Sequence, residues 1–180
     1  NRFLNACEKA SQQFNLINLN KNNEELLGFV DKEGKVRIKP QFSLGNFFQE
    51  GKCAVKNRNG KWGFIDKEGK IVIDYLFDAA GWFINGKAIV SINTKFGAID
   101  GFGKFIINPQ YSDIWIDGEN YLIKQDKKYG WCNANGEIII NPQFEEVLPF
   151  NGSNLAAVEL DKKWGFINNE GQIVINPQFD

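Results

Sequence analysis

The phrase "KWGFIDKEGKIVI" (61–73) returns as "KWGFINNEGQIVI" (163–175), and looser copies occupy much of the chain. The copies align on one glycine, which recurs after 35, 34, 33 and 35 residues, at Gly28, Gly63, Gly97, Gly130 and Gly165. Self-similarity at a fixed period of about 34 residues is the signature of a tandem array of supersecondary units. The chain is therefore expected to fold as a repeat protein.

Each copy predicts the same order of β-strands. The first strand is an apolar stretch such as "LAAVEL", and the second is a segment such as "WGFIN". A polar turn that ends in glycine leads to the third strand, the β-branched "QIVI". Glycine suits the end of this turn because it adopts a positive φ without steric cost. Proline lacks the N–H that a sheet ladder needs, so the third strand should end at the "NPQF" tail. The tail prolines are Pro40, Pro109, Pro142 and Pro177.

The predicted fold is all-β, with about five three-stranded β-meander units in an open, solenoid-like stack. A closed, propeller-like ring is the alternative, and it is less favoured because propeller units usually run to about 40 residues or more with four strands. The units are expected at about 13–46, 47–81, 82–115, 116–149 and 150–180, which together form the repeat domain 13–180. Residues 1–12 differ in composition and are expected to form an N-terminal cap or linker with a short helix.

The glycine inside the second strand needs its own explanation, because glycine weakens a strand and usually marks a bulge or a close approach. We expect an aromatic side chain of the adjoining unit to lie over it. An aromatic stands directly before this glycine in four copies, and three of these residues are assigned to the structural motif: Trp62, Tyr129 and Trp164.

With these residues the chain resembles the WG (or KWG) repeat family, which is found mostly in bacterial proteins. The resemblance covers about residues 13–180 and is loosest where Leu27 replaces the tryptophan and where "DYLF" (74–77) replaces the proline tail. It implies a repeat domain of the interaction or scaffold type, often attached to other domains. It implies no catalytic residues.

The sequence offers little catalytic chemistry. It contains no histidine, which excludes Ser-His-Asp and Cys-His arrangements and histidine-based metal sites. Asp31, Asp66 and Asp100 recur at the turn, where hydrogen bonding within the turn is the expected role. The three cysteines (Cys7, Cys53, Cys132) show no metal-binding spacing and are expected as free thiols. We therefore expect no enzyme activity, no cofactor and no metal.

A second set of aromatics follows the tails, and three of them are candidate ligand contacts: Trp82, Phe83 and Trp115. Such residues could stack on sugars or grip peptide side chains, or they could fill the contacts between units. Exposed Trp82 and Trp115 beside Asp or Asn side chains would favour carbohydrate binding, whereas buried indoles would favour a scaffold.

The net charge and its distribution along the chain indicate which kinds of partner the protein can attract. The net charge is −1, which gives no general attraction to nucleic acid. No run approaches the roughly 20 apolar residues of a membrane helix. Residues 1–70 carry 13 Lys/Arg and 8 Asp/Glu, and residues 71–180 carry 8 and 14, which suggests weak head-to-tail self-association.

The sequence thus predicts a non-catalytic repeat module that mediates protein–protein interaction or scaffolding, with another protein or an attached domain as its partner. A carbohydrate- or cell-wall-binding module is the alternative. The chain begins with asparagine and contains no methionine, as expected of a processed product or a fragment.

Overall fold

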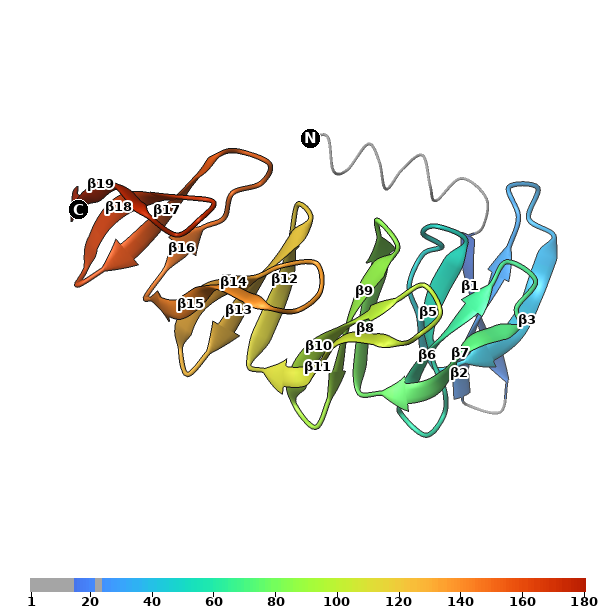
Figure 1. Ribbon diagram of the computed structural model, residues 1–180. Coiled ribbons are helices and arrows are strands. Elements are labelled where there is room, and N and C mark those ends of the chain that lie inside the picture. Colours follow the sequence, from blue (N-terminus) through green and yellow to red (C-terminus); the bar gives the residue numbers. More distant parts are fainter. Residues whose placement is uncertain (1–14, 22–23) are drawn as a thin grey trace. The chain divides into compact units, whose positions relative to one another are not determined.

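The computed structural model describes residues 15–21 and 24–180, and every regular element in these residues is a β-strand (Figure 1). The helix expected within residues 1–12 lies outside the described residues. No helix that could span a membrane occurs in the described part of the chain. The all-β prediction is therefore confirmed.

The strands form five sheets, and each sheet consists of strands that follow one another in the chain. The first two are β1–β3 (Asn15–Lys21, Glu24–Val30, Val36–Phe42) and β4–β7 (Leu44–Gly45, Lys52–Lys56, Trp62–Asp66, Ile71–Phe77). The third is β8–β11 (Ala79–Ile84, Lys87–Ile92, Lys95–Asp100, Phe105–Tyr111). The last two are β12–β15 (Asp113–Asp117, Asn120–Gln125, Lys128–Cys132, Ile138–Phe144) and β16–β19 (Val147–Leu148, Leu155–Leu160, Lys163–Asn168, Ile173–Phe179).

The repeating unit has four strands, so the prediction of three was wrong. The additional strand comes first in its sheet and follows the tail of the preceding sheet after one or two residues, as at Phe77 and Ala79. It is as short as two residues in β4 and β16. No glycine turn separates it from the tail, so the sequence gives no boundary signal there.

The turn between the last two strands has the expected chemistry. In the first copy Gly34 has a φ of 80°, and its N–H donates to the carbonyl oxygen of Asp31 at 3.0 Å. The Asp31 carboxylate accepts hydrogen bonds from the N–H groups of Glu33 (3.1 Å) and Lys35 (2.9 Å). The same two side-chain bonds recur at Asp66, Asp100, Asn133 and Asn168. The three aspartates shape turns, as the sequence predicted, and Asn133 and Asn168 do the same.

A bulge explains the glycine of the motif. Trp62 pairs with Phe77 and Phe64 with Ile73, so Gly63 on β6 faces three residues of β7. A Cβ on Gly63 would lie 2.7 Å from the carbonyl oxygen of Ile73, within the same sheet. The expectation that an aromatic of the adjoining unit lies over this glycine was therefore wrong, because the backbone of the next strand occupies that space. Gly28, Gly97, Gly130 and Gly165 meet the backbone of their own sheets in the same way.

The proline of the tail lies within this bulge. The strand β3 runs through Pro40 to Phe42. Its Ile38 pairs with Phe29 and its Phe42 pairs with Leu27. Residues 39–41, which lie between these pairs, have no partner in the register. The missing N–H of the proline therefore costs no ladder bond. The prediction that the third strand ends at proline was wrong, and the strand continues to the aromatic.

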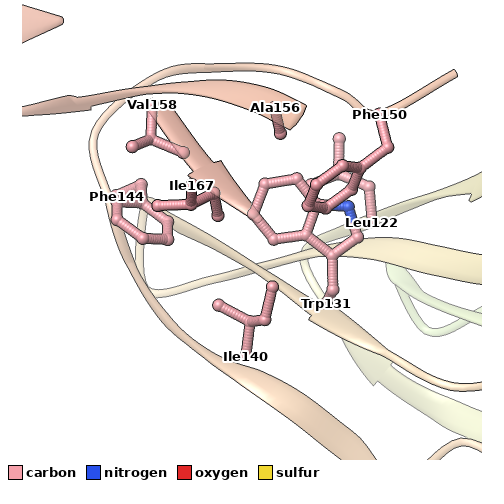
Figure 2. Close-up of a cluster of buried hydrophobic side chains, with 8 residues drawn as sticks. All are labelled: Leu122, Trp131, Ile140, Phe144, Phe150, Ala156, Val158 and Ile167. Atoms are coloured by element: carbon pink, nitrogen blue, oxygen red, sulfur yellow. The ribbon is translucent and has the colours of Figure 1, made fainter. Parts of the chain in front are cut away.

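The chain divides into two compact units, one formed by the described residues up to Asn93 with Ala98–Lys104, the other by Thr94–Gly97 with Phe105–Asp180. The core of the first unit is built around Phe29, Ile38, Phe42, Phe48, Cys53, Val55 and Ile65. The core of the second, shown in Figure 2, consists of Leu122, Trp131, Ile140, Phe144, Phe150, Ala156, Val158 and Ile167. Each core joins successive sheets, β1–β3 with β4–β7 in the first unit and β12–β15 with β16–β19 in the second.

The contact between successive sheets, here called a joint, uses a recurring trio of aromatics. The residue after the motif glycine meets the tail aromatic of its own sheet and an aromatic of the next unit. Trp131 lies 6.2 Å from Phe144 and 5.3 Å from Phe150 between ring centroids, both edge to face. The equivalent trios are Phe29 with Phe42 and Phe48, and Phe64 with Phe77 and Phe83.

Each joint also contains a turn glycine that packs on an isoleucine of the preceding sheet. A Cβ on Gly69 would lie 3.1 Å from a side-chain carbon of Ile38, and one on Gly171 would lie 3.1 Å from Ile140. Gly103 meets Ile73 and Gly136 meets Ile107 in the same manner. The sequence motif therefore recurs because each copy contains both the turn glycine and the isoleucine that this contact requires.

Candidate functional site

The three aromatics singled out by the sequence have different environments. Trp82 is 46% exposed and Trp115 is 40% exposed, whereas Phe83 is 2% exposed. The Phe83 ring lies 4.9 Å from that of Phe64, and the Lys52 ammonium approaches its face at 5.0 Å. Phe83 is therefore part of a joint, and its burial removes it from the candidate ligand contacts.

Trp82 on β8 has little space beside it. The depression that it forms with Phe47, Phe48 and Gln49 measures about 20 Å³. Ligand pockets usually measure about 300–1,000 Å³, so this depression is too small for a ring. Among the described residues, Trp82 is thus an exposed indole beside a depression that is too small for a ring.

Trp115 borders a much larger space of about 340 Å³, which we name the Trp115 hollow. It is lined by Trp115, Ile116, Asp117, Leu122, Tyr129, Val147, Pro149 and Asn151. All these residues belong to the second compact unit. Most of the lining is apolar, with Asp117 and Asn151 as the polar exceptions.

Trp115 and Tyr129 form the aromatic wall of the hollow, and the register of the sheet puts both side chains on the same face. Trp115 on β12 pairs with Leu122 on β13, and Tyr129 on β14 pairs with Lys124 on β13. Directly paired residues share a face, as do residues two apart in a strand, so these four side chains lie on one face of the sheet. The Trp115 and Tyr129 rings are 6.0 Å apart between centroids and tilted by 34°.

Lys124 fixes the tyrosine of this wall. Its ammonium lies 4.3 Å from the centroid of the Tyr129 ring and donates a hydrogen bond of 2.7 Å to the Tyr129 hydroxyl. This hydrogen bond is the largest contribution that raises the pKa of Lys124 above its usual value. The Lys124 side chain therefore stays charged at neutral pH and holds the Tyr129 ring in place through the hydrogen bond and the cation–π contact.

Asp117 was not expected from the sequence as a key residue. It is 6% exposed, and its carboxylate accepts hydrogen bonds from the Trp131 indole (2.8 Å) and from the N–H groups of Phe150 (3.1 Å) and Asn151 (2.8 Å). It therefore fixes the aromatic trio of its joint and the turn of the following unit. Glu50 acts similarly, because its carboxylate accepts hydrogen bonds from the backbone N–H groups of Asn85 (2.6 Å) and Gly86 (2.8 Å).

A sequence signal for these carboxylates does exist. Each unit after the first carries a residue–glycine pair near its start, and the pairs are Glu50-Gly51, Asn85-Gly86, Asp117-Gly118 and Asn151-Gly152. The acidic members alternate with asparagine, and each carboxylate holds the backbone at the asparagine pair of the next unit. Only the repeat alignment makes this alternation visible.

In the part of the chain that the structure describes, the remaining ionisable groups offer neither a cluster for a metal ion nor a reactive thiol. The described residues contain no group of three or more His, Cys, Asp or Glu side chains placed to hold a metal ion. The thiols of Cys53 and Cys132 are buried and unpaired by disulfides. Burial raises the pKa of Cys53 to about 12 and that of Cys132 to about 11, which makes both thiols poor nucleophiles.

The fold and the site together define a β-meander repeat protein with an aromatic hollow among its described residues. The chain belongs to the family of WG containing repeats, whose model matches five consecutive copies at residues 28–62, 62–96, 96–129, 129–164 and 164–180. The resemblance proposed from the sequence is therefore confirmed. This family is not a known enzyme family. No curated protein matches the chain.

Solved structures are similar in fold alone. The computationally designed protein Ika8 matches with a TM-score of 0.51 and 8% identity, over 91% of this chain and 58% of its own. Hsv2p of Kluyveromyces lactis matches with a TM-score of 0.51 and 13% identity, over 86% of this chain and 58% of its own. The WD40 β-propeller domain of Doa1 matches at 0.46 and 8% identity, over 92% and 65%. The chain thus spans about three fifths of the length of these structures.

Proposed function

We propose that the chain is a protein-binding repeat module without catalytic activity of its own. The observation that supports this is a pair of exposed apolar side chains at the same place in three of the five sheets. These pairs are Ile71 with Val72, Ile138 with Ile139, and Ile173 with Val174, and their exposed fractions range from 39 to 54%. In the first sheet Val36 is 45% exposed at this place.

The pairs lie on the last strand of each sheet, which forms one of its edges (β3, β7, β15 and β19). Edge strands are usually protected by charges, because an open edge is a template for another strand. Here the exposed positions at the start of β7, β15 and β19 carry isoleucine and valine, although β3 has the charged residues Arg37 and Lys39 and β7 has Asp74. An extended segment of another protein could add to such an edge through main-chain hydrogen bonds and cover the apolar pair. The near-zero net charge of −1 fits a protein partner better than nucleic acid.

The test is capture from extracts of the source organism with the chain immobilised. Captured proteins are identified by mass spectrometry, purified and tested for direct binding to the chain. The double variant Val72→Lys/Ile139→Lys should weaken that direct binding by about tenfold or more, because it places charge on two edges. Phe102→Lys is the matched control, since Phe102 is 94% exposed but lies in a turn. A purified partner that binds the double variant as well as the wild type would refute the edge as the binding surface.

The carbohydrate-binding alternative retains two observations in its favour: Trp82 and Trp115 are both exposed, and Trp115 lies beside Asp117 and Asn151. Two observations weaken it. Phe83 is buried and the depression beside Trp82 measures only about 20 Å³, so of the three candidate aromatics Trp115 is the one that borders a larger hollow. The Asp117 carboxylate already accepts three internal hydrogen bonds. Retention of the chain on an insoluble polysaccharide, lost in Trp115→Ala, would support this alternative over the first.

A further inference from the structure

We propose that the Trp115 hollow binds a proline-containing extended segment of a partner protein, with a proline ring against Trp115 and Tyr129. This inference rests on the proposed function, because it takes the ligand to be a protein. It concerns a different surface, since Trp115 lies on β12 and the exposed apolar pair of the same sheet lies on β15, at the opposite edge.

The shape of the hollow suits a small, rigid ring. Its aromatic rings are tilted by 34° with centroids 6.0 Å apart, so they are oblique to each other, and Trp115 is 40% exposed. The volume of about 340 Å³ lies near the lower end of the range for ligand pockets, which leaves room for one or two small rings. Pro149 and Val147 bound the hollow on the side of the following sheet.

The polar groups of the hollow decide between a sugar and a proline. A carboxylate offers about four acceptor sites, and Asp117 uses three of them internally. Among the described residues, the indole N–H of Trp115 and the side-chain amide of Asn151 have no hydrogen-bond partner, so they are the principal groups left for a ligand. A sugar ring would bring several hydroxyls against a mostly apolar lining, and each one left unsatisfied would cost about 1–3 kcal/mol.

A proline makes smaller demands. It has no N–H to satisfy, and its ring packs on aromatic faces through C–H groups. The carbonyl of a polyproline II segment points outward and can accept a hydrogen bond from the Trp115 indole, as in other aromatic-lined grooves that recognise this conformation. A polyproline II segment is also preformed, so it loses little conformational entropy on binding.

The probe is a fluorescein-labelled peptide of nine prolines, compared with a glycine–serine peptide of equal length and with a linear glucose hexasaccharide. Binding to the whole chain is measured by fluorescence anisotropy for the peptides and by calorimetry for the sugar. We expect saturable binding of the proline peptide alone. Trp115→Ala should weaken it by about tenfold or more. Trp82→Ala is the matched control, because Trp82 has similar exposure but borders a depression of only about 20 Å³, and this variant should bind like the wild type.

Folding of each variant is checked by its urea midpoint and circular dichroism. If Trp115→Ala does not fold, the wild-type protein still decides the question, because the indole N–H resonance of Trp115, assigned with Trp115→Phe, should shift on addition of the proline peptide. No binding at millimolar peptide, binding of the hexasaccharide instead, or equal losses in Trp115→Ala and Trp82→Ala would overturn the proposal. These failures are separable from failure of the proposed function, which is tested with the edge variant Val72→Lys/Ile139→Lys.

Discussion

Gly63 and the carbonyl group of Ile73 leave no room between them for a side chain. A Cβ at Gly63 would lie 2.7 Å from that oxygen and 3.0 Å from the carbonyl carbon of Asp74. Both atoms belong to the backbone of the adjacent strand, which cannot move aside as a flexible side chain can. The glycine is therefore a requirement of the bulge.

Gly63→Ala should lower the free energy of unfolding by about 2 kcal/mol or more, because the strand has to shift to admit a methyl group. Gly101→Ala is the matched control, since the nearest atoms to its Cβ would be the Lys52 ammonium at 3.7 Å and the Gly86 carbonyl oxygen at 4.0 Å. Urea denaturation of the two variants measures the difference. Equal and small losses would show that the bulge tolerates a side chain.

Asp117→Asn should destabilise the protein by about 2 kcal/mol. The amide keeps one acceptor oxygen but presents an NH₂ group to a donor, either the Trp131 indole or a backbone N–H. Glu50→Gln is the comparison, because Glu50 is exposed and uses each oxygen for a single backbone N–H. Its loss in urea melts should be clearly smaller. A larger loss for Glu50→Gln would mean that burial does not determine the strength of these carboxylate contacts.

The buried thiols predict a stability that declines at alkaline pH. Burial raises the pKa of Cys53 to about 12 and of Cys132 to about 11, whereas an unfolded cysteine titrates near 8.5. The stability linked to each thiol is fully present below about pH 8.5 and is lost as the pH rises through the folded pKa. Urea melts between these limits should show the decline. Cys132→Ile, which installs the residue found at Ile65, Ile99 and Ile167, should make the decline shallower, and an unchanged slope would contradict the role of Cys132.

Ending the chain after Phe144 should leave a folded but less stable protein. This truncation removes β16–β19 and with them Phe150, which covers Trp131 in the joint. In an open array units contact only their neighbours, so the loss of a terminal unit is tolerated, whereas a closed ring would be broken. Tryptophan fluorescence should shift to the red while the β-sheet circular dichroism persists. Complete loss of the sheet signal would instead favour the ring.

The sequence predicts the all-β repeat architecture well, because five copies of one motif show its strands and turns more clearly than a single copy would. The turn at Asp31 and Gly34 and the dependence of each unit on the next were both expected and both hold. The fourth strand was not expected, since β4 and β16 have only two residues each and no turn residue precedes them. The role of Pro40 was misjudged because a bulge is invisible to strand propensity, which assumes an unbroken ladder.

The site was harder to predict than the fold. Trp115 and Phe83 look alike in sequence, as aromatics that follow a tail, yet one is 40% and the other 2% exposed. Their exposure depends on which face of the first strand each residue occupies, and the sequence does not define that strand. Asp117 was overlooked for a related reason, because its three donors come from residues 14 to 34 positions further along the chain.

The contact between a turn glycine and the isoleucine of the preceding sheet has an evolutionary consequence. Gly171 meets Ile140 as Gly69 meets Ile38, so every unit offers an isoleucine on one side and a glycine on the other. A gene segment that duplicates one unit therefore brings both halves of the contact with it. For this contact, the gain or loss of a whole copy needs no compensating substitution.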